Sequence, residues 1–233
     1  MKESNQYLDR IDQVVEMPQP ATTAVQDAPA PIARHRRGTA VQPRGRARII
    51  EIIEATTELF LEHGESAITI RNVANKLGLS PGNVTYYFKS GEDLFRSMFD
   101  HVNNQYLNKS ASIIDREDLT ADERFIMWVE WLIDTARSSD AQRFHYQLWS
   151  LSLAHDYVQE KRDTFYRDYW RLARDVIKQV NPRASRNAIA DLASELCVTV
   201  EGLFVMFGNK REGVRPAMLR NFPHRMLSSI KAS

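Results

Sequence analysis

The sequence has a single cysteine, Cys197, so no disulfide can form within one chain. Such sparing use of cysteine is typical of a reducing compartment, and we expect a cytoplasmic protein. No apolar run reaches the roughly 18 residues that a membrane helix needs. The N-terminus has no cationic start followed by an apolar core. The sequence therefore predicts neither a membrane-spanning segment nor a signal peptide.

The sequence also lacks the short patterns that accompany catalysis and metal binding. It contains no Gly-rich phosphate loop, no nucleophile elbow and no zinc-protease helix. Its six histidines form no close i,i+4 pair, which is the spacing that places two ligands on one helix face. We therefore expect no enzymatic activity, no cofactor and no metal. A helical enzyme is kept as a minor alternative.

Excess charge of one sign is missing from the whole chain but present locally. The formal net charge is +1, so any affinity for nucleic acid must come from a patch. Residues 34–48 carry six arginines and no acid. This segment overlaps the end of a proline-containing stretch, residues 1–45. That stretch has too little apolar surface to bury for stable folding, so we expect it to be a disordered arm. Two interpretations of this arm stay open: a solvated linker, or a basic arm that lies along DNA.

The most informative stretch is residues 69–92, TIRNVANKLGLSPGNVTYYFKSGE. Thr69 is a suitable N-cap for a short helix that Gly78 ends, because glycine adopts a left-handed backbone without strain. Ser80 and Pro81 then suit the start of a second helix, which runs to about Phe88. This arrangement is a helix-turn-helix, whose second helix enters a DNA major groove.

Helical spacing predicts which side chains of this motif face outward. Val84 and Phe88 point inward, so Asn83 and Thr85 point away from them and suit contacts with base edges. Tyr86 and its flanking polar neighbours suit contacts with phosphates, which set the register without specifying sequence. The predicted DNA-binding residues are Arg46, Thr69, Arg71, Ser80, Asn83, Thr85, Tyr86, Tyr87 and Lys89.

These motifs carry a family resemblance. Helix 46–62 (RARIIEIIEATTELFLE), the helix-turn-helix and the following EDLF resemble, in order and spacing, the N-terminal domain of TetR-family transcriptional regulators. The resemblance covers Arg46 to Phe95. It implies an operator-binding protein with a larger effector-binding and dimerisation domain. The family usually has a lysine or arginine that holds a DNA phosphate where Gly91 stands here, and Lys89 is the candidate to replace it.

The rest of the chain predicts a helical bundle. Thr120 and Glu123 form a capping box before an amphipathic helix, and further helices are expected over about 156–180 and 185–207. A last helix begins near Pro216, and Pro223 is expected to kink or break it. The predicted fold is all-α: a three-helix DNA-binding domain (46–95) and a larger bundle (96–233) for ligand binding and dimerisation.

Aromatic side chains concentrate in the second half, where all four tryptophans lie between positions 128 and 170. Most rings at helical spacing pack a core. Two reasons also favour a pocket for an unidentified small-molecule effector: the rings have polar neighbours such as Gln147 and His155, and the family resemblance implies such a pocket. The predicted effector-binding residues are Trp128, Trp131, Phe144, His145, Trp149, Tyr166 and Trp170.

Two apolar stripes lie near the C-terminus, and the first, in the helix over about 185–207, is close to a coiled-coil pattern. They predict a homodimer held by a four-helix contact, and the competing interpretation is that one chain buries both stripes itself. The predicted interface residues are Leu196, Val200, Leu203, Phe207, Met218, Phe222 and Met226.

The combined hypothesis is a homodimeric DNA-binding transcriptional regulator, most often a repressor in the family that it resembles. It would bind a palindromic operator in double-stranded DNA and leave it when a small molecule binds. The alternative within DNA binding is a TetR-like protein without a ligand, with an architectural or partner-recruiting role.

Overall fold

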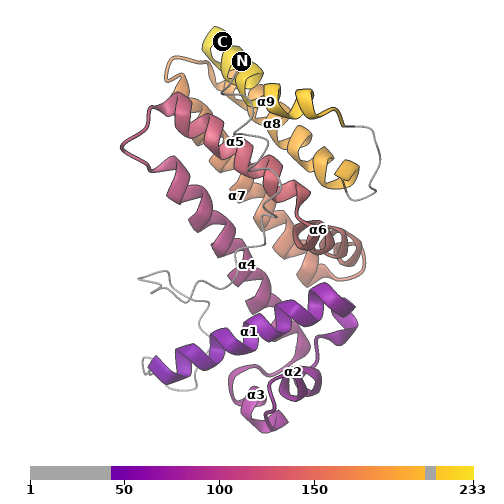
Figure 1. The fold of residues 1–233 in the computed structure, drawn as a ribbon. Coiled ribbons are helices and arrows are strands. Elements are labelled where there is room, and N and C mark those ends of the chain that lie inside the picture. The colour runs from indigo at the N-terminus through magenta and orange to yellow at the C-terminus, as the bar shows by residue number, and fades with distance from the viewer. Residues whose placement is uncertain (1–42, 208–213) are drawn as a thin grey trace, which may run out of the picture. The chain divides into compact units, whose positions relative to one another are not determined.

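The computed structural model describes residues 43–207 and 214–233, and within these ranges the regular structure is helical throughout. This confirms the predicted all-α class (Figure 1). In chain order the elements are α1 (Pro43–His63), the 3-10 turn η1 (Glu65–Ala67), α2 (Ile70–Lys76), α3 (Pro81–Tyr87), α4 (Gly91–Ile114), α5 (Ala121–Arg137), α6 (Ser139–Ser152), α7 (Asp156–Val180), α8 (Arg186–Phe207) and α9 (Pro216–Ala232).

Local sequence signals explain most helix ends. The capping box of α5 is confirmed: Glu123 donates its backbone N–H to Thr120 Oγ1, and its carboxylate accepts from the Thr120 N–H. α1 begins at Pro43, three residues before the predicted start, because proline at a first helical position lacks only an N–H that the first turn leaves unbonded. The last three residues of the predicted arm are therefore helical, and residues 1–42 lie outside the described chain.

Of the two outcomes expected for Pro223, the break in the last helix is wrong, and the kink stays a prediction. α9 runs without interruption from Pro216 to Ala232, with Pro223 inside it. The proline ring is buried together with the neighbouring Phe222. Packing of this face outweighs the hydrogen bond that a proline cannot donate.

The described residues form two compact units. The N-terminal unit comprises residues 43–111 and 143–168, and the C-terminal unit comprises residues 112–142, 169–207 and 214–233. These units follow from packing. The predicted division at residue 95 concerns function, and it stays a prediction.

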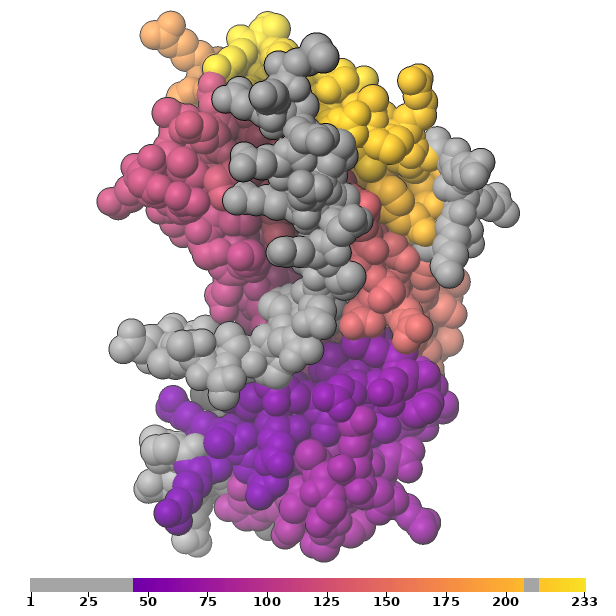
Figure 2. Space-filling model, in the orientation of Figure 1, coloured from indigo at the N-terminus to yellow at the C-terminus, as the bar shows by residue number. Residues whose placement is uncertain are grey.

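A continuous apolar core holds the N-terminal unit together. The Phe60 ring of α1 meets Phe95 of α4 and Phe144 of α6 edge-on, at centroid distances of 5.8 and 5.5 Å. Val84 and Phe88 place the motif's second helix in the same core. Figure 2 shows one face of these helices, in indigo to purple, as a closely packed surface. The DNA-binding motif therefore shares its core with α6 and with the start of α7.

In the C-terminal unit, α5 packs against α8 and α9, and α8 also packs against α9 (Figure 1). Trp128 is fully buried between these helices, and Tyr169, Leu196 and Ile230 are buried with it. The Asn181 amide donates to the carbonyl of Ile230 over 2.8 Å and so fastens the end of α7 to the end of α9.

Candidate nucleic-acid interface

The turn between α2 and α3 forms as predicted. Thr69 accepts a hydrogen bond from the Asn72 N–H through its hydroxyl, at 3.1 Å, which caps α2. Gly78 adopts φ +64°, the left-handed backbone that ends the helix. The Leu79 N–H then reaches the Ala74 carbonyl at 2.8 Å and closes the turn. Ser80 stands at the N-cap position of α3 without a side-chain cap bond, so its hydroxyl is not used for capping.

One face of α3 is buried and the other is open. Val84 is fully buried and Phe88 nearly so, whereas Asn83, Thr85 and Tyr86 are exposed. The Thr85 hydroxyl donates to the Pro81 carbonyl over 2.9 Å, which leaves its oxygen free to accept. The Tyr86 ring lies edge-on to Tyr87 at 4.8 Å and is held at the helix surface. Asn83, Thr85 and Tyr86 form a short polar ridge on this helix, with the side-chain chemistry that major-groove reading needs.

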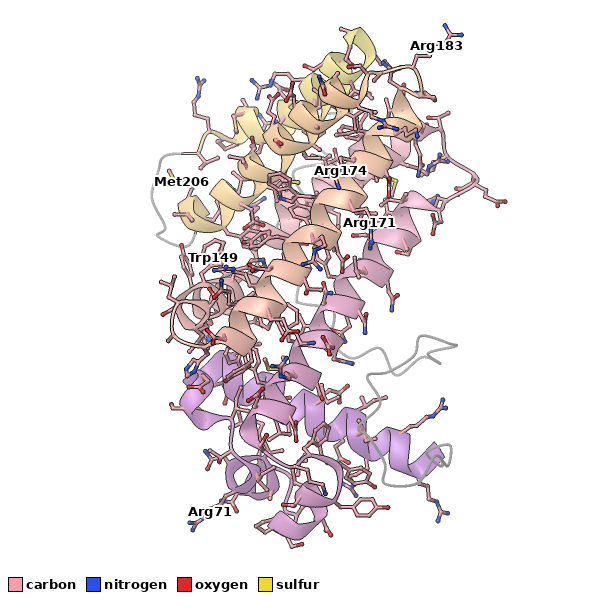
Figure 3. The ribbon with its side chains drawn as sticks, turned by 180° about the vertical axis from the view of Figure 1, so that it is seen from behind. Arg71, Trp149, Arg171, Arg174, Arg183 and Met206 are labelled. Carbon is pink, nitrogen blue, oxygen red and sulfur yellow. The ribbon has the colours of Figure 1, made fainter. Side chains whose placement is uncertain are left out.

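The other predicted DNA contacts surround this ridge. Arg46 on α1 and Arg71 on α2 are exposed, and Figure 3 shows Arg71 projecting away from the helix-turn-helix. Thr69 is exposed and Tyr87 is half-buried. Both arginines lie in the same unit as α3, so they suit contacts with the sugar-phosphate backbone on the flanks of a half-site.

Lys89 has a role that the sequence analysis did not assign. Its ammonium donates to the Thr85 carbonyl at 2.6 Å and to the Tyr86 carbonyl at 3.4 Å, which caps the C-terminal end of α3. An ammonium has three donors, so one remains for another acceptor. The signal for this cap was present in the sequence, since lysine often bonds the last carbonyls of a helix.

Gly91 has a steric reason to be glycine. A Cβ at this first residue of α4 would lie 2.5 Å from the backbone carbonyl oxygen of Ile68, closer than real contacts allow. Any other residue would push α4 away from the segment that leads into α2. The basic residue that the family resemblance implies at this position is therefore excluded by backbone packing, which no sequence pattern indicated.

The predicted effector-binding residues are divided between the two units. Phe144 belongs to the core of the N-terminal unit, against Phe60 and Phe99. In the C-terminal unit, Trp128 is fully buried and Trp170 is exposed. Trp131 is half-buried in the same unit as these two tryptophans.

The remaining three predicted effector residues come together in the N-terminal unit. The Trp149 indole N–H donates to the Tyr166 hydroxyl at 2.6 Å, and the His145 ring lies edge-on to Trp149 at 5.9 Å. Phe165 lies against His145 at 6.0 Å. We call His145, Trp149, Phe165 and Tyr166 the aromatic cluster. Figure 3 marks Trp149 on α6.

The predicted dimer residues lie mostly inside their own chain. Within the C-terminal unit, at most 4% of the surface of Leu196, Val200, Leu203, Phe222 and Met226 is exposed. Phe207 is half-buried and Met218 is exposed. This burial supports the competing interpretation, that one chain covers these stripes itself, for five of the seven residues.

Cys197 is buried in the same unit. Burial raises the pKa of its thiol to about 12, and the nearby Tyr169 only partly opposes this. The thiolate that redox chemistry needs is therefore scarce at neutral pH, and a buried structural thiol is the better interpretation.

Within residues 43–207 and 214–233, no helix combines the length and the apolarity needed to cross a membrane.

Comparison with known proteins identifies the motif. Residues 52–98 match the family described as bacterial regulatory proteins, tetR family. An uncharacterised HTH-type transcriptional regulator in the dhlA 5' region of Xanthobacter autotrophicus is 29% identical over 163 residues, which are 68% of this chain and 79% of that one.

Two solved structures share the fold. A TetR-family transcriptional regulator from Mesorhizobium loti matches with a TM-score of 0.67 and 15% identity, over 82% of this chain and 98% of that one. A transcriptional regulator from Saccharomonospora viridis in complex with choline matches with a TM-score of 0.65 and 16% identity, over 78% and 96%.

The helix-turn-helix with its open polar ridge, carried on an all-helical fold, defines a DNA-binding transcriptional regulator. The chain resembles the TetR family over residues 52–98, which contain this motif, and its related sequences are HTH-type transcriptional regulators.

Proposed function

We propose that two copies of this chain bind a palindromic operator in the cytoplasm, each reading one half-site, and that a small molecule releases them. The observation that carries this proposal is the polar ridge of α3, held open by the buried Val84 and Phe88. One chain carries one helix-turn-helix, and a two-fold pair suits an operator with two-fold symmetry. Repression is the expected outcome.

Within each half-site, Asn83 and Thr85 are the proposed base readers and the surrounding residues contact the backbone. The Asn83 amide can pair its NH2 donor and its carbonyl acceptor with an adenine edge. Phosphates attract cations and accept hydrogen bonds. The proposed phosphate contacts are the cationic Arg46, Arg71 and Lys89 and the hydroxyl of Tyr86. Thr69, Ser80 and Tyr87 complete the proposed backbone contacts.

Lys89 is the proposed replacement for the basic residue that backbone packing excludes at position 91. Its two bonds to the end of α3 hold the ammonium in one place and leave the third donor for a phosphate. A residue held in this way loses less side-chain entropy when DNA binds.

We expect Lys89→Gln to make operator affinity less sensitive to salt. Each phosphate contact contributes about 0.9 to the slope of log affinity against log salt, so the slope should fall by about 1 per chain. The measurement is operator binding between low and physiological salt. The matched control is Lys178→Gln, which removes an exposed charge from the C-terminal unit and should leave the slope unchanged. Equal slopes in all three proteins would exclude the Lys89 contact.

The aromatic cluster is the proposed effector contact. α6 contributes both to the core and to the aromatic cluster. Phe144 and Leu148 pack in the core that also holds the DNA-binding helices, and His145 and Trp149 belong to the cluster. A ligand that separates Trp149 from Tyr166 would displace α6, and α6 contacts α1 through Phe60. Binding can therefore alter the DNA-binding helices within one packed unit.

We expect the true effector to change tryptophan fluorescence and to release operator DNA over the same concentration range. The first probe is choline, which the Saccharomonospora viridis regulator binds, followed by a metabolite library. Trp149→Phe should remove most of the fluorescence change, because it deletes the indole that lies in the proposed effector contact with Tyr166. The control, Trp170→Phe, changes an exposed ring of the other unit and should retain the change.

Saturating operator DNA should weaken effector binding by the same factor by which the effector weakens DNA binding. If no compound alters either signal, the alternative of an architectural regulator without a ligand becomes the better account.

A further inference from the structure

A buried side-chain oxygen on α4 has no hydrogen-bond partner among the described residues. It is the carbonyl oxygen Oδ1 of Asn103, in the N-terminal unit. Buried polar atoms of native proteins are almost always hydrogen-bonded, because an unpaired acceptor loses the bonds that water gave it. Such an exception needs a physical reason, and a ligand that brings the missing donor supplies one.

Asn103 lies on the face of α4 that contacts the aromatic cluster. Phe99, Asn103 and Tyr106 follow one another at spacings of four and three residues, which places them on one side of the helix. The Tyr106 ring lies 5.6 Å from Phe165 of the cluster. The Phe99 ring lies 6.2 Å from Phe144, which precedes the cluster's histidine on α6. Asn103 therefore stands between two ring contacts that join α4 to α6 and α7, and its side chain is directed toward the cluster.

A second unpartnered acceptor of this unit lies elsewhere. The Gln147 side-chain oxygen is also buried without a donor among the described residues. A Cβ added to Gly64 would lie 3.5 Å from this oxygen, which places it at the end of α1. Gln147 therefore offers a matched comparison: the same chemical group, in the same unit, beside other neighbours.

The chemistry around Asn103 favours an uncharged ligand. The unpaired oxygen belongs to a neutral amide, so it offers a hydrogen bond but no charge to balance that of an ion. Asp100, three residues earlier on α4, already forms an ion pair with Lys161 of α7. Within the cluster the neighbouring rings meet edge-on, and each such contact covers a ring face that a cation would need.

We propose that the effector is an uncharged molecule with a flat apolar body and a hydroxyl or N–H group, which donates a hydrogen bond to Asn103 Oδ1. This inference rests on the proposed effector contact at the aromatic cluster and names the chemical class that the contact accepts. A site with a buried acceptor discriminates strongly against a ligand of the same shape that lacks the donor, because the acceptor then stays unpaired.

Isothermal titration calorimetry of the full-length chain with two matched pairs of probes tests this class. Indole and phenol carry a donor on a flat ring, and in N-methylindole and anisole a methyl group replaces the donor hydrogen. We expect each donor probe to bind about tenfold to hundredfold more tightly than its methylated partner. Choline, a cation, and octanoate, an anion, should bind more weakly than both donor probes.

Two variants assign the preference to one oxygen. Asn103→Leu removes the acceptor at similar volume, so indole and N-methylindole should bind with nearly equal affinity. No donor of the described chain loses a partner in this variant, so its melting temperature should not fall. The matched control, Gln147→Leu, removes the oxygen at the end of α1 and should keep the full preference for indole.

The outcomes separate the class of ligand from the effector contact itself. If indole and phenol do not bind, if they bind no better than their methylated partners, or if Asn103→Leu keeps the preference, the donor contact is wrong. If choline or octanoate binds more tightly than both and Trp149→Phe weakens that binding, the cluster stays the effector contact and the uncharged class is wrong. If Trp149→Phe changes the binding of no probe, the proposed effector contact fails together with this inference.

Discussion

Gly91→Ala is expected to lower the free energy of unfolding of the N-terminal unit by about 1–3 kcal/mol, the usual cost of overpacking. The added Cβ would lie 2.5 Å from the Ile68 carbonyl oxygen, which is backbone and cannot rotate away. Relief requires that α4 move from the segment preceding α2. Because Leu94 and Phe95 of α4 pack in the core with Val84 and Phe88, that movement also loosens α3.

Thermal and urea unfolding followed by circular dichroism measure this effect. The matched control is Gly82→Ala, because a Cβ there meets only the Ser80 hydroxyl oxygen at 3.8 Å. Alanine is the better helix former, so this control should gain up to about 1 kcal/mol. A Gly91→Ala protein as stable as the unmodified chain would show that α4 can shift at little cost. The steric explanation for the lack of a lysine or arginine at position 91 would then be wrong.

Asn83→Ala is expected to weaken binding to the operator by about 1–3 kcal/mol, the contribution of one good bidentate base contact. Asn83 is exposed on a short helix whose inner side is fixed in the core by the fully buried Val84, so the helix holds Asn83 on its outer surface. The change removes no charge and therefore leaves the electrostatic attraction to DNA intact. Affinity for unrelated DNA should stay the same.

Local chemistry explains why the DNA-binding motif could be predicted. Thr69, Gly78 and the capping box of Thr120 and Glu123 act through neighbours within a few residues, and all three behave as expected. Gly91 was different, because its contact with Ile68 joins two segments whose approach depends on the whole core. A residue pattern contains no such distance.

The C-terminal unit shows a second limit of sequence patterns. α8 has apolar residues on both sides, so periodicity finds the stripe of Leu196, Val200 and Leu203 but not what covers it. Packing against α5 and α9 buries that stripe and leaves Val198 and Val205 exposed. Likewise, only three of the seven predicted effector-binding residues lie together in the aromatic cluster. The burial of Trp128 in another unit depends on tertiary packing.

The most direct test of the central claim, that α3 reads DNA sequence, is a paired titration. An operator is first selected from random DNA with the unmodified chain. Its affinity and that of a shuffled duplex are then measured at one salt concentration for the unmodified chain, Asn83→Ala and the control Asn108→Ala, which removes an exposed amide of α4. The account predicts that Asn83→Ala loses about tenfold or more on the operator and nothing on the shuffled duplex, while the control loses neither. Equal losses on both duplexes, or none on the operator, would contradict it.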